Sequence, residues 1–334
     1  MHALRIEVTR GRLVESIHRV SAVVVDADNR LVAASGDPGL VTFWRSAAKP
    51  FQSLPLVEDG VAERFGLDDE DLALACASHS SEPFHLAGVD RFLAKVGVPE
   101  TALACGPHPP LSAEVADRVL RQGLTLTPRW SNCSGKHTGM LALAKHHGWP
   151  LVGYERAGHP VQNRILGEVE RWTGVGRGEL EMAVDGCTTV CFGLPLRAMA
   201  LAYARFGTSA DAGPRRLWRA TTTHPHLVAG TKRVCTEVMK AWPGEIFAKI
   251  GAEGVYSAAI PRLALGIAIK VEDGDWRSAG VVLLAVVRQL LSLRGERAAL
   301  EALDQLPESA DAPIHTTRGE VAGQFRVAGR LELF

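Results

Sequence analysis

This chain of 334 residues has no excess of charge of either sign, because its 37 lysines and arginines balance its 37 aspartates and glutamates. Proteins that hold nucleic acid or an anionic membrane on their surface use a broad positive field to do so. The balanced composition argues against such a field. We therefore expect no nucleic acid and no membrane among its partners.

The chain also lacks a secretory signal and a long run of apolar residues. Its N-terminus, MHALRIEVTRGRLVES, alternates polar and apolar residues and has no apolar core of the kind that signals contain. The most apolar stretch, residues 279–293, is interrupted by Arg288 and is shorter than the about 20 apolar residues that cross a bilayer. That stretch predicts a buried helix, and the missing signal predicts a cytoplasmic protein.

The six cysteines do not form a disulfide pattern. They are scattered along the chain at Cys76, Cys105, Cys133, Cys187, Cys191 and Cys235. Small disulfide-bonded proteins instead place their cysteines densely and at regular spacings. In a reducing cytoplasm we expect most of these cysteines to be free thiols.

Strand patterns occupy the two ends of the chain, and a helical pattern occupies its middle. Residues 4–36 alternate and are rich in β-branched side chains, and VVVDADNRLVAA predicts two strands joined by a turn at residues 27–29. Helical periodicity runs from Ser46 to about Phe206, as in FHLAGVDRFLAKVG, where Gly97 ends the helix. Strands return in EIFAKIG, GVYSAAI and LALGIAIKVEDGD, followed by an apolar helix over residues 278–293.

These patterns predict one α+β domain over residues 1–334. Residues 1–45 and 244–334 mainly form an antiparallel sheet, and residues 46–243 are a mainly helical insert. Because a sheet built from both chain ends closes only when the whole chain is present, the halves are not expected to be independent domains. The tail after Leu306 is weakly patterned, and we expect it to pack loosely.

A serine and a lysine stand three residues apart in RSAAKP, residues 45–50, where the strand pattern gives way to helix. Residues at this spacing share one face of a helix, so the Ser46 hydroxyl and the Lys49 amine can meet. A lysine that takes the proton of a serine makes that serine a nucleophile. The alternative is structural, with Ser46 as a helix cap and Lys49 in solvent.

A second polar motif, ASHSSEP at residues 77–83, follows the apolar run LALACA. Four polar side chains at the end of a buried element indicate an interior cleft. The alternative is that Ser80 or Ser81 caps the helix that begins near Pro83. That alternative leaves Ser78 without an explanation.

Two further motifs contain a cysteine each. WSNCSGKHTG, residues 130–139, places a thiol, a lysine and an imidazole at a helix N-terminus, where backbone donors and metal ligands come together. It lacks the full spacing of a phosphate loop, which excludes nucleotide binding. DGCTT, residues 185–189, follows a short apolar run, and its cysteine is equally well explained as a small buried side chain.

Lys249 ends the strand pattern EIFAKIG, and the glycines of KIGAEG permit a tight return into the next strand. A lysine followed by glycine at a strand edge, with a Ser-x-x-Lys earlier in the chain, also occurs in penicillin-binding enzymes.

Taken together, RSAAKPFQ, CASHSSEPFH, NCSGKHTGM, VDGCTTV, His224-Pro225 and KIGAEGVY resemble the asparaginase II family of the rhizobial thermolabile type. The motifs occur in the order of that family and span residues 8–287. The resemblance implies a fold similar to serine β-lactamases and glutaminases, a homodimer, and hydrolysis of L-asparagine to L-aspartate and ammonia.

The resemblance also implies roles for individual residues. It assigns catalysis to two serine-lysine pairs, Ser46 with Lys49 and Ser78 with Lys249. It assigns substrate binding to Arg45, His79, Asn132 and His137. It assigns one zinc ion per chain to Cys133, Lys136 and Cys187, with Asp185 near a metal-bound water. A lysine ligand must be neutral, and the metal favours that form.

The implied mechanism is a double displacement through an acyl-enzyme. Either serine can carry the acyl group, and we prefer Ser46, because it lies in the Ser-x-x-Lys motif, with Ser78 as a relay. Two other functions stay open. One is hydrolysis of another amide by a β-lactamase-like or glutaminase-like enzyme, and the other is a non-catalytic zinc-binding protein.

Overall fold

The computed structural model describes residues 3–306 and 311–334. The chain forms two compact units, each assembled from separate stretches of sequence. The first unit comprises residues 1–47, 194–208 and 237–334, and the second comprises residues 48–193 and 209–236. The expected helical insert, residues 46–243, therefore corresponds largely to the second unit, except that residues 46–47, 194–208 and 237–243 belong to the first.

The first unit contains most of the strands. Its elements are β1 (Arg5–Arg10), β2 (Leu13–Asp26), β3 (Leu31–Ser35), β4 (Val41–Phe43), η1 (Arg45–Ala48), α9 (Leu196–Thr208), β7 (Phe247–Ile250), β8 (Val255–Ile260), η4 (Pro261–Leu263), β9 (Leu265–Val271), α13 (Trp276–Leu293), α14 (Arg297–Asp304), β10 (Asp311–His315), β11 (Val321–Ala328) and β12 (Glu332–Leu333).

The described residues of this unit form a nine-stranded antiparallel sheet in the order β10-β11-β1-β2-β9-β8-β7, in which β3 pairs with β2 and β12 pairs with β3. Strands from the two chain ends lie next to each other. Strand β1 pairs with β11, with Arg5 opposite Ala328, and β2 pairs with β9, with Val20 opposite Val271. The prediction of an α+β fold with a sheet built from both ends is confirmed.

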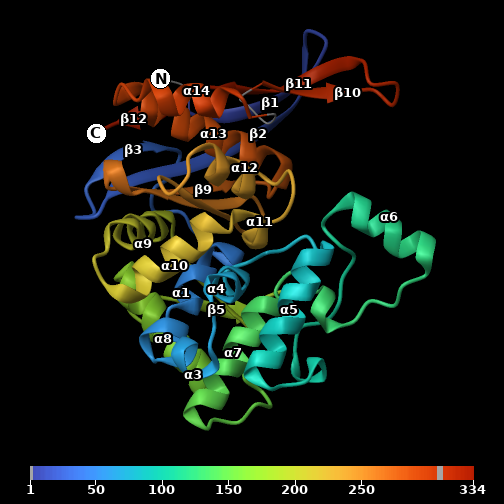
Figure 1. Ribbon diagram of the computed structural model, residues 1–334. Coiled ribbons are helices and arrows are strands. Elements are labelled where there is room, and N and C mark those ends of the chain that lie inside the picture. The colour runs from blue at the N-terminus through green and yellow to red at the C-terminus, as the bar shows by residue number, and fades with distance from the viewer. Residues whose placement is uncertain (1–2, 307–310) are drawn as a thin grey trace. The chain divides into compact units, whose positions relative to one another are not determined.

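Strand β2 explains how this sheet is covered. Its first half pairs with β1 and is largely exposed, whereas residues 20–25 are fully buried between β3 and β9. A strand buried on both faces needs a layer on each side. Helix α9 contacts β2 and β9 below the sheet in Figure 1, and α13 contacts β9 and β8 above it.

The C-terminal tail is part of this sheet. Residues 307–310 lie outside the described residues, but residues 311–315 and 321–328 form β10 and β11, and Leu331 is buried. The expectation that the tail packs loosely is wrong for residues 311–334, because β11 supplies the backbone partners along one edge of β1.

Helix α13 confirms the predicted apolar helix. Among the described residues it is the one helix long and apolar enough to cross a membrane by length and composition, with a mean hydropathy of 1.3 over its 18 residues. However, 61% of it is buried inside the protein, which is typical of a core helix.

The second unit is mainly helical. Its elements are α1 (Lys49–Ser53), α2 (Pro55–Glu58), α3 (Val61–Phe65), α4 (Asp69–Ala75), α5 (Pro83–Val96), η2 (Glu100–Ala102), α6 (Ala113–Gln122), η3 (Pro128–Trp130), α7 (Ser134–His147), α8 (Pro160–Thr173), β5 (Glu181–Val184), α10 (Ala212–Thr223) and α11 (Pro225–Val228); β6 (Val190–Pro195) and α12 (Val234–Ala241) each continue from one unit into the other.

Local signals in this unit are mostly confirmed. Helix α5 ends at Gly97, which adopts the left-handed conformation. The strands β5 and β6, which pair antiparallel from Glu181 opposite Gly193, were missed by the helical pattern. Residues 185–188 form the turn between them, so Asp185 and Gly186 at its start were the available signal.

Candidate active site

The Ser78 motif lies in a buried extended segment that follows α4. The backbone N–H of Ser78 donates to the Val228 carbonyl at 2.9 Å, and that of His79 donates to the Asn132 carbonyl at 3.2 Å. Neighbouring segments therefore hold this stretch from two sides. The four polar side chains from Ser78 to Ser81 are all buried.

The capping alternative for Ser80 and Ser81 is wrong. The N-cap of α5 is Glu82, whose backbone N–H donates to His85 Nδ1 at 3.1 Å. Ser80 Oγ instead donates to the Ala229 carbonyl at 2.9 Å, and Ser81 Oγ donates to the Trp130 carbonyl at 2.8 Å. Both hydroxyls tie the segment to other parts of the second unit.

Lys49 begins α1 and is 1% exposed, so the alternative of a solvated lysine is wrong. Its Nζ lies 3.0 Å from Ser78 Oγ and 3.1 Å from Cys133 Sγ, and it also donates to the Ala77 carbonyl. The amine is therefore within proton-transfer distance of the Ser78 hydroxyl, which is the geometry that a lysine base requires.

Ser46 lies in the 3₁₀ turn η1, three residues before Lys49, and is half-buried. It does not cap α1, because Ala48 holds the N-cap position and no side chain completes the cap. The preceding Arg45 has a φ of 53°, a left-handed conformation that is costly for arginine. Backbone strain of this kind is concentrated at functional sites.

Lys249 lies in the first unit, as Ser46 does. It is fully buried at the end of β7, and its Nζ donates to the Ile250 carbonyl at 2.8 Å. Lys249 stands opposite Ser257, whose Oγ accepts a hydrogen bond from Trp44 Nε1 at 3.1 Å. The Lys249 strand is thereby connected to the segment that leads into Ser46.

A cluster of sulfur and nitrogen atoms adjoins Lys49. Cys133 is the N-cap residue of α7, Lys136 lies in the first turn of that helix, and Cys187 lies in the turn between β5 and β6. Lys136 Nζ lies 3.0 Å from Cys187 Sγ and 2.8 Å from Thr189 Oγ1. All four side chains are buried.

The hydrogen bond between the two thiols separates their pKa values. As the donor, Cys133 has a pKa well above its usual value, and burial acts in the same direction. That bond holds the pKa of Cys187 far below its usual value, although burial opposes it, and Lys136 lowers it further. Burial lowers the pKa of Lys136, but Cys187 and Cys133 raise it by more. These shifts favour a negative charge on Cys187 and a positive charge on Lys136.

The donor chemistry of this cluster fits zinc, which binds thiolate sulfur and nitrogen ligands. Across residues 3–306 and 311–334, no group of three or more His, Cys, Asp or Glu side chains is arranged to hold a metal, so a zinc ion here would need Lys136 as a ligand. Among these described residues, His137 Nε2 is buried and has no hydrogen-bond partner within ordinary distance and angle. It lies beside Cys187, so one further polar atom faces the cluster. Asp185 lies within electrostatic reach of Lys136.

Two of the side chains expected to bind substrate, His79 and Asn132, contact other polar groups of the protein. His79 Nδ1 accepts from the Ser81 N–H at 3.2 Å, so its Nε2 donates to Ser134 Oγ at 2.9 Å. Burial lowers the pKa of His79 well below its usual value, which keeps the ring neutral. Asn132 Oδ1 lies 3.1 Å from Cys133 Sγ.

Tyr154 was missed by sequence reasoning. Its hydroxyl accepts from the Ala104 N–H at 2.9 Å and forms a hydrogen bond of 2.6 Å with His137 Nδ1. This bond orients the His137 ring beside Cys187. A single tyrosine in VGYER carries no local signal for such a role.

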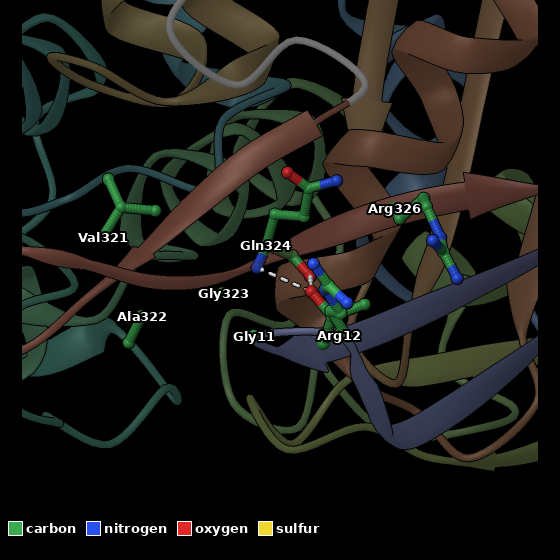
Figure 2. A pocket seen from close by; sticks show the side chains of 8 residues that line it. Gly11, Arg12, Val321, Ala322, Gly323, Gln324 and Arg326 are labelled. Carbon is green, nitrogen blue, oxygen red and sulfur yellow. Dashed lines mark hydrogen bonds between the residues drawn. The ribbon is translucent and has the colours of Figure 1, made fainter.

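A pocket in the first unit has a volume of about 450 Å³ and lies between the β1–β2 turn and β11 (Figure 2). Its lining includes Thr9, Arg12, Gln324 and Arg326, and Thr9 Oγ1 accepts from the Gln324 N–H at 3.1 Å. None of the residues predicted for catalysis lines it, so it is not the candidate active site.

A model of the family described as L-asparaginase II matches residues 6–327. No curated protein matches the chain. Similar solved structures include a putative beta-lactamase from Bacteroides dorei DSM 17855, with 13% identity, 75% of this chain and 84% of that chain covered, and a TM-score of 0.39. They also include the octameric penicillin-binding protein homologue from Pyrococcus abyssi, with 13% identity, 86% of this chain and 75% of that chain covered, and a TM-score of 0.34.

Proposed function

This chain belongs to the L-asparaginase II family and is therefore an asparaginase-type amidohydrolase, and we propose that it hydrolyses L-asparagine to L-aspartate and ammonia through an acyl-serine. The observation that carries the serine mechanism is the 3.0 Å contact between Lys49 Nζ and Ser78 Oγ, both buried. That contact favours Ser78 over Ser46 as the serine that Lys49 deprotonates. Ser46 and Lys249, which share the first unit, are then the second serine-lysine pair.

In the proposed reaction, neutral Lys49 takes the proton of the Ser78 hydroxyl as Oγ attacks the side-chain amide carbon of the substrate. The carbon–nitrogen bond then breaks, and the leaving nitrogen takes the proton from Lys49 and departs as ammonia. Water attacks the resulting ester, Lys49 accepts its proton, and the proton returns to Ser78 Oγ as aspartate leaves.

In this proposal, Cys133, Lys136 and Cys187 would bind a zinc ion, and Asp185 would lie near a metal-bound water. When bound, the ion would supply a positive charge to position a polar group of the substrate. Cys133 contacts Lys49 directly, so the ligand residues also hold the base in place.

The test is ammonia release from a panel of L-asparagine, L-glutamine and a β-lactam, with ring opening measured for the last. We expect kcat/KM for asparagine to exceed that for glutamine by about 100-fold, because one more methylene moves the reacting carbonyl by roughly 1 Å. No turnover of asparagine, or equal turnover of both amides, would contradict the assignment of the substrate. Ring opening of the β-lactam alone would favour a β-lactamase instead.

A further inference from the structure

The loop at residues 229–233 is fixed against the Ser78 motif within the second unit. The Thr231 N–H donates to Glu82 Oε1 at 2.8 Å, and Thr231 Oγ1 donates to Glu82 Oε2 at 2.6 Å. Gly230 has a φ of 129°, and a Cβ there would lie 2.5 Å from Glu82 Oε1 and 2.7 Å from Ser80 Oγ. The loop therefore touches the motif so closely that only glycine fits.

This loop places the guanidinium of Arg233 beside Ser80. Arg233 NH1 donates to Ser80 Oγ at 3.2 Å, and the side chain is half-buried. A guanidinium has five N–H donors, and this contact uses one of them. The remaining donors are available for a planar acceptor such as a carboxylate, which binds arginine in a bidentate manner.

Arg233 has no acidic partner among the described residues, whereas several other arginines of the same unit have one. Arg129 pairs with Asp90 at 2.5 Å, and Arg219 pairs with Asp69 at 2.8 Å. The nearest carboxylate in the motif, that of Glu82, is already occupied by Thr231. The two buried lysines next to the motif are also engaged, Lys49 with Ser78 and Lys136 with Cys187.

We propose that Arg233 binds the α-carboxylate of the amino-acid amide substrate and thereby determines specificity. Ser80 follows Ser78 by two residues, so the two residues are at most about 7 Å apart along the chain. In asparagine, three carbon–carbon bonds of about 1.5 Å separate the amide carbon from the carboxylate carbon, a span of roughly 4 Å. A substrate held by Arg233 at its carboxylate therefore reaches Ser78 with its amide. This inference rests on the proposed function.

The experiment compares wild type with Arg233→Met and Arg233→Lys on two substrates. One is L-asparagine, and the other is β-alaninamide, which is asparagine without its carboxylate. The matched control is Lys232→Met, which removes one positive charge from the neighbouring exposed position of the same loop. Thermal melts of all variants report whether the loop keeps its fold.

We expect Arg233→Met to raise KM for asparagine roughly 30- to 100-fold, as for the loss of a hydrogen-bonded charge pair, with a much smaller change in kcat. Its kcat/KM for β-alaninamide should stay within twofold of wild type. Arg233→Lys should recover part of the affinity, because it restores the charge without the bidentate geometry. Lys232→Met should behave as wild type.

An equal loss on both substrates would overturn the inference, because it would show that Arg233 only supports the loop. Equal effects of Arg233→Met and Lys232→Met would overturn it as well, because they would reveal a general field effect. If wild type does not hydrolyse asparagine, the proposed function fails. Binding of L-aspartate to wild type and to Arg233→Met, measured by calorimetry, then tests separately whether Arg233 binds a carboxylate. Binding by wild type and not by Arg233→Met supports the carboxylate site, whereas no binding by either protein rejects it.

Discussion

Lys49 shows how a single buried side chain connects two parts of the site. Its Nζ contacts Ser78 Oγ on one side and Cys133 Sγ on the other. It makes no ion pair with a carboxylate in the described part of the chain, so no acid competes with the serine for its amine. Any change at Lys49 therefore affects both Ser78 and the thiol cluster of Cys133, Lys136 and Cys187.

Ser78→Ala and Lys49→Met should each lower kcat for asparagine by at least about a thousandfold, because the two groups take part in one proton transfer. For the same reason, the double variant should be little worse than either single one. Steady-state kinetics on the three variants test this prediction. Ser81→Ala, which removes a hydroxyl from the same segment, is the control and should stay within about tenfold of wild type. Full activity of Ser78→Ala together with an inactive Ser46→Ala would show that Ser46, and not Ser78, is the nucleophile.

Cys133→Ser and Cys187→Ser should each remove zinc, because a hydroxyl is a much poorer ligand than a thiolate. Elemental analysis should find about one zinc per chain in wild type and less than about a tenth of that in either variant. Cys191→Ser, a buried cysteine of β6 outside the cluster, should keep its metal. Full metal content in both Cys133→Ser and Cys187→Ser would leave these cysteines as packing residues.

At the scale of elements, the start of α7 depends on close contact with the end of α4. A Cβ at Gly135 would lie 2.3 Å from the Leu74 carbonyl oxygen, a distance at which backbone atoms must move apart. The first turn of α7 also carries Ser134 and Lys136, so a shift here displaces the thiol cluster. A Cβ at Gly139, one turn later, would meet the tip of the Leu56 side chain at 3.0 Å and Ala75 Cβ at 3.6 Å, which is ordinary van der Waals contact.

Gly135→Ala should lower the free energy of unfolding by about 1–3 kcal/mol, the usual cost of overpacking, and should reduce activity. Gly139→Ala is the matched control, because the gain in helix propensity of up to about 1 kcal/mol offsets a contact with a flexible side chain. Denaturant unfolding of both variants measures the difference. Equal stability of the two would show that α4 and α7 tolerate a wider separation.

At the scale of the whole molecule, two stacked histidines make stability depend on pH. The rings of His79 and His85 lie 5.1 Å apart in the interior of the second unit. Burial lowers the pKa of His85 from 6.5 to about 4, while the His226 carbonyl and Glu82 oppose this shift. Protonation of this pair is therefore disfavoured in the folded chain.

Above about pH 6.5, His85 is neutral in both the folded and the unfolded chain. Between pH 6.5 and 4 only the unfolded chain binds the proton, so the free energy of unfolding falls as the pH falls, by about 3 kcal/mol from His85 alone. His85→Gln should lose this part of the pH dependence, as measured by denaturant unfolding at pH 7, 5.5 and 4.5. His315→Gln, at an exposed position, should keep it. Identical pH profiles for wild type and His85→Gln would contradict the prediction.

The sequence by itself determined many of the elements and the kinds of side chain that they carry. Alternation and β-branching predicted β2, β3 and β7 to β9, and Gly97 marked the end of α5, because strand and helix periods and left-handed glycines are properties of neighbouring residues. The motifs likewise led to the serines, lysines and cysteines on which the proposed site is built. Each of these signals lies within a few residues of the feature that it predicts.

Only the tertiary structure decided which of these groups meet. Lys49 contacts a serine 29 residues away, and Tyr154 orients His137 from another segment of the chain. Arg233 joins the Ser78 motif through a loop about 150 residues later in the chain. Such contacts depend on how distant elements pack, and spacing along the chain reports only neighbours on the same element.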